Sequence, residues 1–436
     1  MFRFKAFNAL GLLRVMTHLL PCVSKITSSS LLIRNHPLIL KTMLGHAGRL
    51  CFSRSVAKIS TYGYRNLISR QMSQVRHVSG NSSSSEDEVI LETHGNKCVI
   101  TLNRPKALNA LNLNMIRKIT PVLKQWENEE KVLIIIHGAG EKAFCAGGDV
   151  RSIIESRNQP TSTLFSDFFR EEYQLNYLIS TLQTPYIALI DGITMGGGVG
   201  LSVHGYYRVS SEKTLFAMPE TAIGFVPEVG GTYFLPRLTG KLGMFLALTG
   251  YRLKGADVYH AGISTHAVNN KEVDDIKEEL LSLKMNSQNV EIEGCLAKFT
   301  KSASFLQQPF SLEPHLPLIN DCFSAPSVEE IISRLQASSD PFAKDTLVTI
   351  RKMSPFALKV TKRALDEGSE QTLAECLQME YRLSQRFVAD HDFPEGVRAL
   401  LIDKDQNPKW KPSSLEECTP EKIESYFEPV KDELHL

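Results

Sequence analysis

The chain has 436 residues, of which 42% are hydrophobic, so it is long enough for one large domain or two ordinary domains with a sizeable core. Its charge is unevenly divided, because residues 1–85 carry twelve Lys and Arg and no Asp or Glu, which leaves 37 basic against 48 acidic residues in the rest. A body with a net charge of −11 lacks the basic surface of a general nucleic-acid-binding protein, so we expect no DNA partner.

Residues 1–80 are rich in Arg, Ser, Leu and Phe and lack acidic residues, a composition typical of a mitochondrial transit peptide. Their apolar runs are interrupted by residues such as Arg14 and His18, well short of the ~20 residues that span a bilayer. We therefore predict a location in the mitochondrial matrix and no membrane span. The alternatives are a basic arm that is retained in the mature protein and a plastid address.

The eight cysteines are scattered, without a C-x-x-C pair or a nearby histidine at metal-ligand spacing. We expect reduced, mostly inert thiols and no metal site. Cys145 lies in a glycine turn, but no adjacent group would lower its pKa, so we interpret it as a small packing residue rather than a nucleophile.

The first predicted elements are strands and a helix. Two apolar, β-branched runs, 89–92 and 97–102, flank a His-Gly-Asn turn and indicate a β-hairpin. Residues 109–127 place apolar side chains at helical spacing, with Pro121 as an expected bend. The run 132–136 is apolar on both faces, which is typical of a buried parallel strand.

Helix and strand patterns then alternate. A helix is predicted over 165–182, a strand over 186–190, a helix over 196–204 and a strand over 207–210. Such alternation indicates βαβ units, so the predicted fold class is α/β.

From about residue 271 the pattern changes to helices with few strands, for example 328–335, 357–365 and 373–387. The predicted divisions of the ordered chain are an α/β core at 86–270, a mostly helical C-terminal region packed on it at 271–415, and a tail at 416–436.

Residues 192–231 point most directly to chemistry. A triple glycine, 196–198, follows an apolar run and opens a helix, where backbone N–H groups are unpaired and a ligand can come close. Glu220 and Glu228 follow a second apolar run and are candidates for a base or nucleophile and a second polar group. The alternative is that the glycines serve tight packing and the glutamates face solvent.

A second glycine turn, Gly147-Gly148, lies upstream, again after a buried strand-like run and before a helix-like one. Two such turns at strand ends place two backbone N–H groups around one carbonyl oxygen, an arrangement that stabilises a thioester carbonyl as it develops negative charge. Each motif alone also fits a phosphate-binding nest or a packing turn. We expect Asp149 to cap the helix that follows.

Four motifs together resemble the crotonase (enoyl-CoA hydratase/isomerase) superfamily, over residues 89–266. They are NRPKALNAL at 103–111, AFCAGGD at 143–149, GITMGGGVGLSVHG at 192–205 and MPETAIG at 218–224. Four further segments resemble, more narrowly, the 3-hydroxyisobutyryl-CoA hydrolase family and extend the likeness to about residue 412. They are FREEY at 169–173, YFLPRL at 233–238, MEYRLS at 379–384 and EGVRA at 395–399.

This resemblance implies a crotonase-like spiral of ββα units with a mostly helical C-terminal region, and a CoA thioester bound near the two glycine turns. By position, it implies that the backbone N–H groups of Gly148 and Gly197 form an oxyanion hole. Glu220 matches the principal catalytic carboxylate, and Glu228 matches the second acid of the active site.

Further roles follow from the same resemblance. Glu172 matches a substrate-contacting acid of the hydrolases, and Glu171 is expected to be its surface neighbour; the alternative is the reverse order. No cofactor is expected, since CoA is part of the substrate. The candidate CoA contacts are Lys106, Ala107, Leu108 and Lys404. For Lys404 the alternative is that its side chain is a solvated surface charge without a CoA contact.

The chain departs from the family patterns at two positions. The hydratases carry a catalytic Glu where this chain has Gly200, which favours hydrolysis over hydration. The hydrolases usually carry Asp where this chain has Glu228, one methylene longer, in a site that needs atoms placed within about half an ångström.

The first functional hypothesis is hydrolysis of 3-hydroxyisobutyryl-CoA or a similar short 3-hydroxyacyl-CoA, a reaction of valine catabolism. The second is a catalytically weak relative that serves as a structural protein of the small subunit of mitochondrial ribosomes. The third is an enoyl-CoA hydratase or isomerase. Besides an acyl-CoA substrate, the expected partners are that ribosomal subunit, under the second hypothesis, and further copies of the chain.

Overall fold

The computed structural model describes residues 87–436 except 130, 158, 160–161 and 285–287. The predicted transit peptide at residues 1–80 lies outside the described residues and stays a prediction. Among the helices of the described part, none combines the length and the apolar character that a membrane crossing requires.

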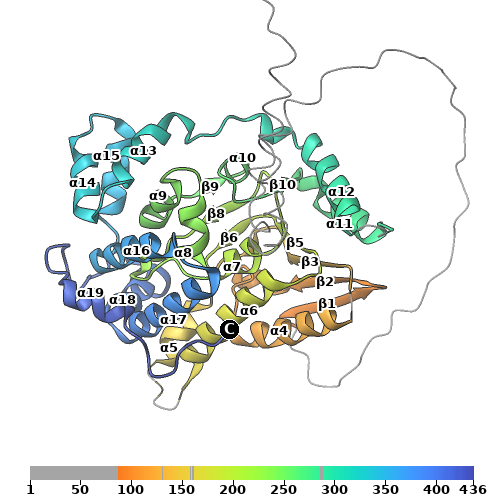
Figure 1. Ribbon diagram of the computed structural model, residues 1–436, viewed down its shortest axis with the longest axis horizontal. Coiled ribbons are helices and arrows are strands. Elements are labelled where there is room, and N and C mark those ends of the chain that lie inside the picture. The colour runs from red at the N-terminus through yellow and green to blue at the C-terminus, as the bar shows by residue number, and fades with distance from the viewer. Residues whose placement is uncertain (1–86, 130, 158, 160–161, 285–287) are drawn as a thin grey trace, which may run out of the picture. The chain divides into compact units, whose positions relative to one another are not determined.

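The larger of two sheets has six strands (Figure 1). Its first two, β1 (Val89–His94) and β2 (Lys97–Leu102), pair antiparallel and confirm the predicted hairpin. The other neighbours run parallel in the order β2-β3-β5-β7-β10. Their bounds are β3 (Leu133–Gly138), β5 (Tyr186–Ile190), β7 (Tyr207–Ser210) and β10 (His266–Ala267).

A smaller sheet has four short strands in the order β4-β6-β8-β9. Each of its first three strands directly follows a strand of the larger sheet: β3 leads to β4, β5 to β6 and β7 to β8. A helical segment follows each pair, so the chain repeats the predicted ββα unit. The bounds are β4 (Ala143–Cys145), β6 (Ile193–Met195), β8 (Leu215–Ala217) and β9 (Leu253–Lys254).

The helix predicted at 109–127 begins later than expected. Asn112 caps it, because its Oδ1 accepts a hydrogen bond from Met115 N at 2.9 Å. The residues before the cap form the 3-10 turn η1 (Pro105–Ala107) and then two left-handed residues, Leu108 and Asn109. The helices of this part are α4 (Leu113–Asn128), α5 (Val150–Ser156), α6 (Leu164–Thr181) and α7 (Gly197–Val203).

After β10 the elements of the described chain are helical, and the predicted helices at 328–335, 357–365 and 373–387 are present as α14, α16 and α17. The later α-helices are α8 (Gly231–Phe234), α9 (Leu242–Thr249), α10 (Ala256–His260), α11 (Val273–Ser282), α12 (Gln288–Ser302), α13 (Leu316–Phe323), α14 (Val328–Ala337), α15 (Pro341–Ile350), α16 (Pro355–Gly368), α17 (Leu373–Ala389), α18 (Asp392–Val397) and α19 (Pro420–Phe427). The short turns include η2 (Glu220–Ile223) of the 3-10 type and η7 (Arg398–Ile402) of the π type.

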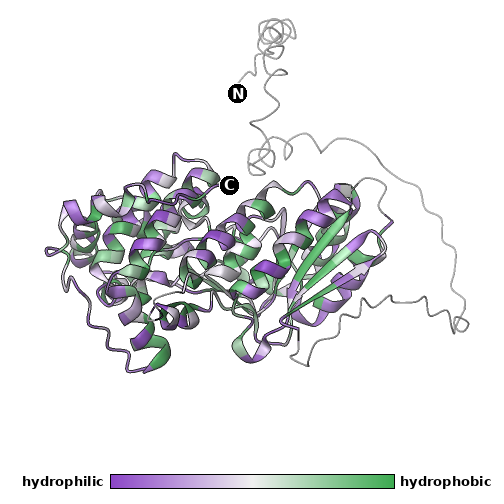
Figure 2. Ribbon diagram, turned by 90° about the horizontal axis from the view of Figure 1, so that it is seen from below, coloured by the Kyte–Doolittle hydropathy of each residue, from purple (hydrophilic) through white to green (hydrophobic). Residues whose placement is uncertain are grey.

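Both faces of the larger sheet are covered. Ile134 and Ile136 of β3 pack in a core with α4 and α6, whereas Leu133 and Ile135 pack with α11 and α12. Successive side chains of a strand point to opposite faces, so these two cores lie on opposite sides of the sheet. Figure 2 shows the hydrophobic strands and the mixed hydrophilic and hydrophobic surfaces of the helices around them. The sheet therefore forms a rigid base for the loops at its strand ends.

Candidate active site

The two glycine turns and Glu220 come together because they follow neighbouring parallel strands. β4, β6 and β8 pair in parallel, so their carboxyl ends lie at the same edge of the smaller sheet. Gly148 follows β4, Gly197 follows β6 and Glu220 follows β8, each within three residues. A Cβ built on Gly196 would lie 3.3 Å from Glu220 Oε1 and 3.5 Å from Gly147 Cα, so the three segments meet closely.

The first glycine turn is fixed by a short parallel bridge between Leu111 and Gly148. Leu111 N donates to Gly147 O at 2.8 Å, and Asp149 N donates to Leu111 O at 2.8 Å. The Gly148 N–H takes no part in this bridge or in the other backbone hydrogen bonds of the described chain. It is therefore free to bind a ligand.

The second turn presents the first N–H groups of α7, which have no partner inside the helix. Gly196 caps this helix with a φ of 45°, a conformation that favours glycine. A Cβ on Gly197 would lie 3.3 Å from Gly148 N and 2.5 Å from Glu172 Oε1. The two glycine turns and Glu172 therefore surround one small space.

Four buried glutamates line or support this space, and each is at most 6% exposed. One oxygen of each of three of them has no hydrogen-bond partner within the described residues. A buried acceptor without a partner costs about 1–3 kcal/mol, so the cluster is arranged for a polar ligand rather than for stability. The four are Glu172 from α6, Glu220 from η2, Glu228 from the loop before α8 and Glu380 from α17.

Burial, and after it the charge of Glu380, raise the pKa of Glu220 to about 8. Burial and the charge of Glu220 raise the pKa of Glu172, and burial and the charge of Glu172 hold the pKa of Glu228 well above its ordinary value. A carboxyl whose pKa lies near neutral pH both accepts and releases protons readily there. The cluster is therefore suited to proton transfer.

Replacing Glu172 with Gln is expected to stabilise the folded protein at alkaline pH. A carboxyl whose pKa is raised by folding binds its proton more tightly in the folded state than in the unfolded state. Its contribution to the free energy of unfolding is full below the unfolded pKa of 4.5 and is lost as the pH rises through the folded pKa of about 8. In thermal unfolding scans from about pH 5 to about pH 9, we expect the Tm of Glu172→Gln to fall less than that of the wild type. Parallel curves would contradict this prediction.

Two neighbours of the site have the structural roles that were predicted for them. Glu171 is at the surface, where its Oε1 lies 2.6 Å from Arg117 Nη2, whereas Glu172 is only 1% exposed. Asp149 caps α5, because its Oδ1 accepts a hydrogen bond from Ser152 N at 3.4 Å. Of the adjacent glutamates, Glu172 is therefore the one that faces the cluster.

The candidate CoA contacts lie in two separate segments. Lys106 and Ala107 are exposed in η1, and Leu108 O accepts a hydrogen bond from Ala146 N at 3.0 Å, which joins this segment to the first glycine turn. Lys404 is exposed in the turn after η7, and no hydrogen bond or ion pair of the described residues joins it to η1 or to the glutamates. The CoA-binding role of all four residues stays a prediction.

The position of Gly200, in the middle of α7, is closed to a side chain. A Cβ there would lie 2.7 Å from Asn176 Nδ2 and 2.7 Å from Val229 Cβ. Both neighbours are fully buried. The packing therefore excludes the carboxylate that the hydratases carry at this position.

Replacing Gly200 with Ala is expected to lower the free energy of unfolding by about 1–3 kcal/mol, because the added methyl group overpacks a buried contact. Urea denaturation measures this change. Gly294→Ala is the control, since that glycine lies in α12 with nothing within 4 Å of an added Cβ. Equal free energies of unfolding for Gly200→Ala and Gly294→Ala would contradict the prediction that a Cβ at position 200 overpacks the core.

Comparison with known proteins places the chain in a family. A family model described as Enoyl-CoA hydratase/isomerase matches residues 97–427. The human protein named 3-hydroxyisobutyryl-CoA hydrolase, mitochondrial, is 54% identical over 379 residues, which cover 86% of this chain and 96% of the human one. The chain belongs to the 3-hydroxyisobutyryl-CoA hydrolase family. The bovine protein of the same name is 53% identical over 378 residues, with the same coverage of both chains.

Solved structures agree with this family membership. The crystal structure of a carnitinyl-CoA dehydratase from Mycobacterium thermoresistibile has a TM-score of 0.74 at 36% identity and covers 80% of this chain and 99% of that one. An enoyl-CoA hydratase from Rhodobacter sphaeroides has a TM-score of 0.71 at 33% identity and covers 80% and 100%. These likenesses confirm the predicted crotonase-like fold.

The sequence motifs indicate no role for Glu380, an acid in the MEYRLS segment that resembles this family. The available signal was its place on a helix: Leu377 and Leu383, three residues to either side, are both fully buried. A glutamate on the buried face of an amphipathic helix is removed from water and has to find polar partners inside the protein. Glu380 therefore completes the acidic cluster from the C-terminal region.

The turn that carries Glu220 is anchored from the same region, by the start of α16 and the segment after α18. The buried Asp392 carboxyl accepts hydrogen bonds from Ser354 Oγ at 2.6 Å and from Lys411 N at 2.8 Å. Ser354 N donates in turn to Thr221 O, within η2, at 3.2 Å. The start of α16, α18 and the following C-terminal segment thus meet behind Glu220.

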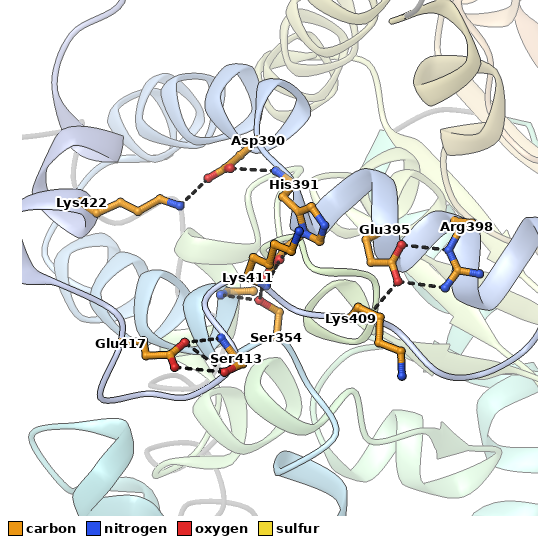
Figure 3. Close-up of polar contacts among 12 residues, drawn as sticks. Ser354, Asp390, His391, Glu395, Arg398, Lys409, Lys411, Ser413, Glu417 and Lys422 are labelled. Carbon is orange, nitrogen blue, oxygen red and sulfur yellow. Dashed lines mark hydrogen bonds and ion pairs between the residues drawn. The ribbon is translucent and has the colours of Figure 1, made fainter.

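α18 packs directly on η2. A Cβ on Gly396 would collide with the backbone of Ile223, so the glycine allows the two backbones to touch. On its outer side, Glu395 accepts hydrogen bonds from Arg398 Nε at 2.8 Å and from Lys409 N at 2.7 Å, which bind the C-terminal segment to α18 (Figure 3). The C-terminal helices therefore support η2, the turn of the α/β part that carries Glu220.

Proposed function

We propose that the protein hydrolyses 3-hydroxyisobutyryl-CoA, or a similar short 3-hydroxyacyl-CoA, to the free hydroxy acid and CoA. The observation that carries this proposal is the 54% identity to the human hydrolase over 96% of that protein. The buried glutamates beside two glycine turns are consistent with it. We further propose that the protein acts in the mitochondrial matrix, since the relatives are named as mitochondrial.

In the proposed reaction, Glu220 takes a proton from a water molecule whose oxygen forms a bond to the thioester carbonyl carbon. The carbonyl oxygen becomes an oxyanion that the N–H groups of Gly148 and Gly197 stabilise. Collapse of the tetrahedral intermediate restores the C=O bond and breaks the C–S bond, and the CoA thiolate takes up the proton held by Glu220. Glu172 and Glu228 orient the substrate hydroxyl or the water. No cofactor enters this scheme.

A covalent route uses the same residues. The Glu220 carboxylate attacks the carbonyl carbon and the CoA thiolate leaves; water then hydrolyses the mixed anhydride, and the proton released in this step goes to the thiolate. In a single turnover in H₂¹⁸O, ¹⁸O enters the Glu220 side chain when the water attacks the Glu220 carbonyl carbon of the anhydride, a result that the general-base route does not give. Mass spectrometry of the peptide that contains Glu220 detects the label.

The two other hypotheses have weaker support. The relatives reported above are named as hydrolases, and none as a ribosomal protein. Hydration of a double bond would need a replacement for the carboxylate that the packing excludes at Gly200. Cosedimentation of the protein with the mitochondrial ribosomal small subunit in a sucrose gradient would favour the scaffold, and turnover of crotonyl-CoA would favour the hydratase.

The decisive test is a steady-state assay of residues 81–436 with 3-hydroxyisobutyryl-CoA, in which the released CoA thiol is titrated. Isobutyryl-CoA, which lacks the hydroxyl group, is the matched substrate control. We expect saturable hydrolysis of the hydroxy substrate and a lower kcat/KM for the control, because a site that binds a hydroxyl group leaves buried polar groups unpaired without it. No thiol release from either substrate would overturn the proposed function. Light scattering of the same sample tests the predicted self-association.

A further inference from the structure

The loop between Glu228 and α8 contains two consecutive residues in left-handed conformations. Val229 has a φ of 53° and Gly230 a φ of 81°. A β-branched residue in this region is a strained outlier, and such strain costs about 1–3 kcal/mol. Val229 is also fully buried, so it has no freedom to relax into solvent. The surrounding groups must therefore hold this turn in place.

Both edges of the peptide group between Val229 and Gly230 are bound by side chains. On one edge, His204 Nε2 donates to Val229 O at 2.6 Å. On the other, Gly230 N donates to Glu380 Oε2 at 2.7 Å. Fixing the C=O and the N–H of one peptide group fixes the orientation of its plane. Val229 is held with this plane, and Glu228 directly precedes Val229 in the chain.

Glu380 binds the next turn of the chain as well. Its Oε1 accepts hydrogen bonds from Thr232 N at 2.9 Å and from Thr232 Oγ1 at 2.6 Å. Burial raises the pKa of Glu380 to about 7, while the hydrogen bonds from Thr232 and Gly230 lower it and so favour the ionised carboxylate. Gly230 must be a glycine for this arrangement, since a Cβ there would collide with the ring of His204.

We propose that Glu380 is a positioning residue of the active site, which acts through the Val229–Gly230 peptide to hold Glu228 in the acidic cluster. This inference rests on the proposed function, because it assigns the support of an acid that the hydrolysis uses. α17 is a suitable platform: it packs against α6, which carries Glu172, and begins with a capping box of Thr372 and Glu375. Glu380 itself is 0% exposed.

The negative charge of Glu380 has a second effect on the cluster. It raises the pKa of Glu220, after burial, and it also raises the pKa of Glu172 and of Glu228. A Gln at this position would lack this charge, and it would also lose one of the two acceptor oxygens that bind the turn, because an amide has one oxygen acceptor and one NH₂ donor. The ionisable groups that face the cluster include Glu172 and Tyr173 on α6, Cys145 on β4, His204 after α7, Glu220 on η2, Glu228 before α8, and Cys376 and Glu380 on α17.

The test compares Glu380→Gln with Thr372→Ala. The second variant removes the cap of α17, which weakens the same helix without touching the turn. For hydrolysis of 3-hydroxyisobutyryl-CoA, we expect kcat of Glu380→Gln to fall by on the order of 10²-fold with KM nearly unchanged, since misplaced catalytic groups lower kcat. The acid limb of its pH–rate profile should move to lower pH, because Glu220 loses a negative neighbour and ionises more easily. Thr372→Ala should lower Tm and leave kcat and the acid limb unchanged.

A second variant and a second measurement keep the test decisive. Thr232→Val removes one of the three donors and retains the shape, so it reports on the same contact if Glu380→Gln does not fold. Hydrogen exchange of the peptide spanning residues 226–234 reports on the turn without any substrate. We expect faster exchange in Glu380→Gln and Thr232→Val than in the wild type and Thr372→Ala. Absence of thioesterase activity in the wild type would overturn the proposed function. The inference about Glu380 would be overturned by unchanged hydrogen exchange in Glu380→Gln, or by equal losses of kcat in Glu380→Gln and Thr372→Ala.

Discussion

Replacing Glu220 with Gln is expected to lower kcat for 3-hydroxyisobutyryl-CoA by about 10²–10⁴-fold, the usual contribution of a positioned acid–base group. Gln retains the volume of the side chain, so the packing around η2 is preserved, but the amide neither accepts a proton nor attacks a carbonyl carbon. We expect KM to change little, because the oxyanion donors and Glu172 remain. Steady-state kinetics above pH 8 measure the effect where Glu220 of the wild type is largely ionised.

Glu171→Gln is the matched control for this prediction. Its carboxyl lies at the surface in an ion pair with Arg117, and the substitution makes the same chemical change outside the cluster. We expect kcat of Glu171→Gln to equal that of the wild type. Circular dichroism of both variants tests their folding. If Glu220→Gln retained more than a tenth of the wild-type kcat, the assignment of Glu220 would be wrong.

Replacing Gly197 with Ala is expected to lower kcat by about 10²–10³-fold, the effect of losing an oxyanion-hole donor. The added Cβ would lie 2.5 Å from Glu172 Oε1 and 3.3 Å from Gly148 N, so it would occupy the space between the two glycine turns. The carbonyl oxygen of the substrate would then be displaced from both N–H donors. Single-turnover kinetics at saturating substrate separate this chemical effect from weaker binding.

Gly294→Ala serves as the control here as well, because it adds the same methyl group in open space within α12. Alanine favours a helix over glycine, so this variant should be as stable as the wild type or slightly more so, with unchanged kcat. Full activity of Gly197→Ala would contradict the oxyanion-hole role of this glycine. A substrate analogue that still bound with wild-type affinity, with kcat reduced, would support it.

The sequence predicts those helices and strands whose hydrophobic pattern extends over enough consecutive residues to show a period. The buried run at 132–136, the hairpin at 89–102 and the long helix at 165–182 each have a clear period, and the structure contains them as β3, β1-β2 and α6. The family motifs predicted the glycine turns and Glu220, which the parallel strands β4, β6 and β8 bring to one edge. Strands of three residues are too short to show a period, so the sequence does not distinguish β4 and β6 from those turns.

Other features depend on contacts between distant segments, which periodicity does not report. Nothing near Gly200 in the sequence indicates that Asn176 and Val229 close its surroundings. The role of Glu380 depends on donors that are 148 and 150 residues away in the chain. Local patterns therefore indicate the candidate site residues, whereas the contacts that support them are visible only in three dimensions.

The contact between Gly230 and Glu380 also has a consequence for synthesis of the protein. A ribosome makes the glycine turns, Glu220 and Glu228 long before it makes Glu380, which follows Gly230 by 150 residues. An incomplete chain therefore lacks the carboxylate that holds the strained turn, as well as the helix that backs Glu220. We expect nascent and truncated chains to be inactive toward CoA esters, so that hydrolysis begins only when the polypeptide is complete.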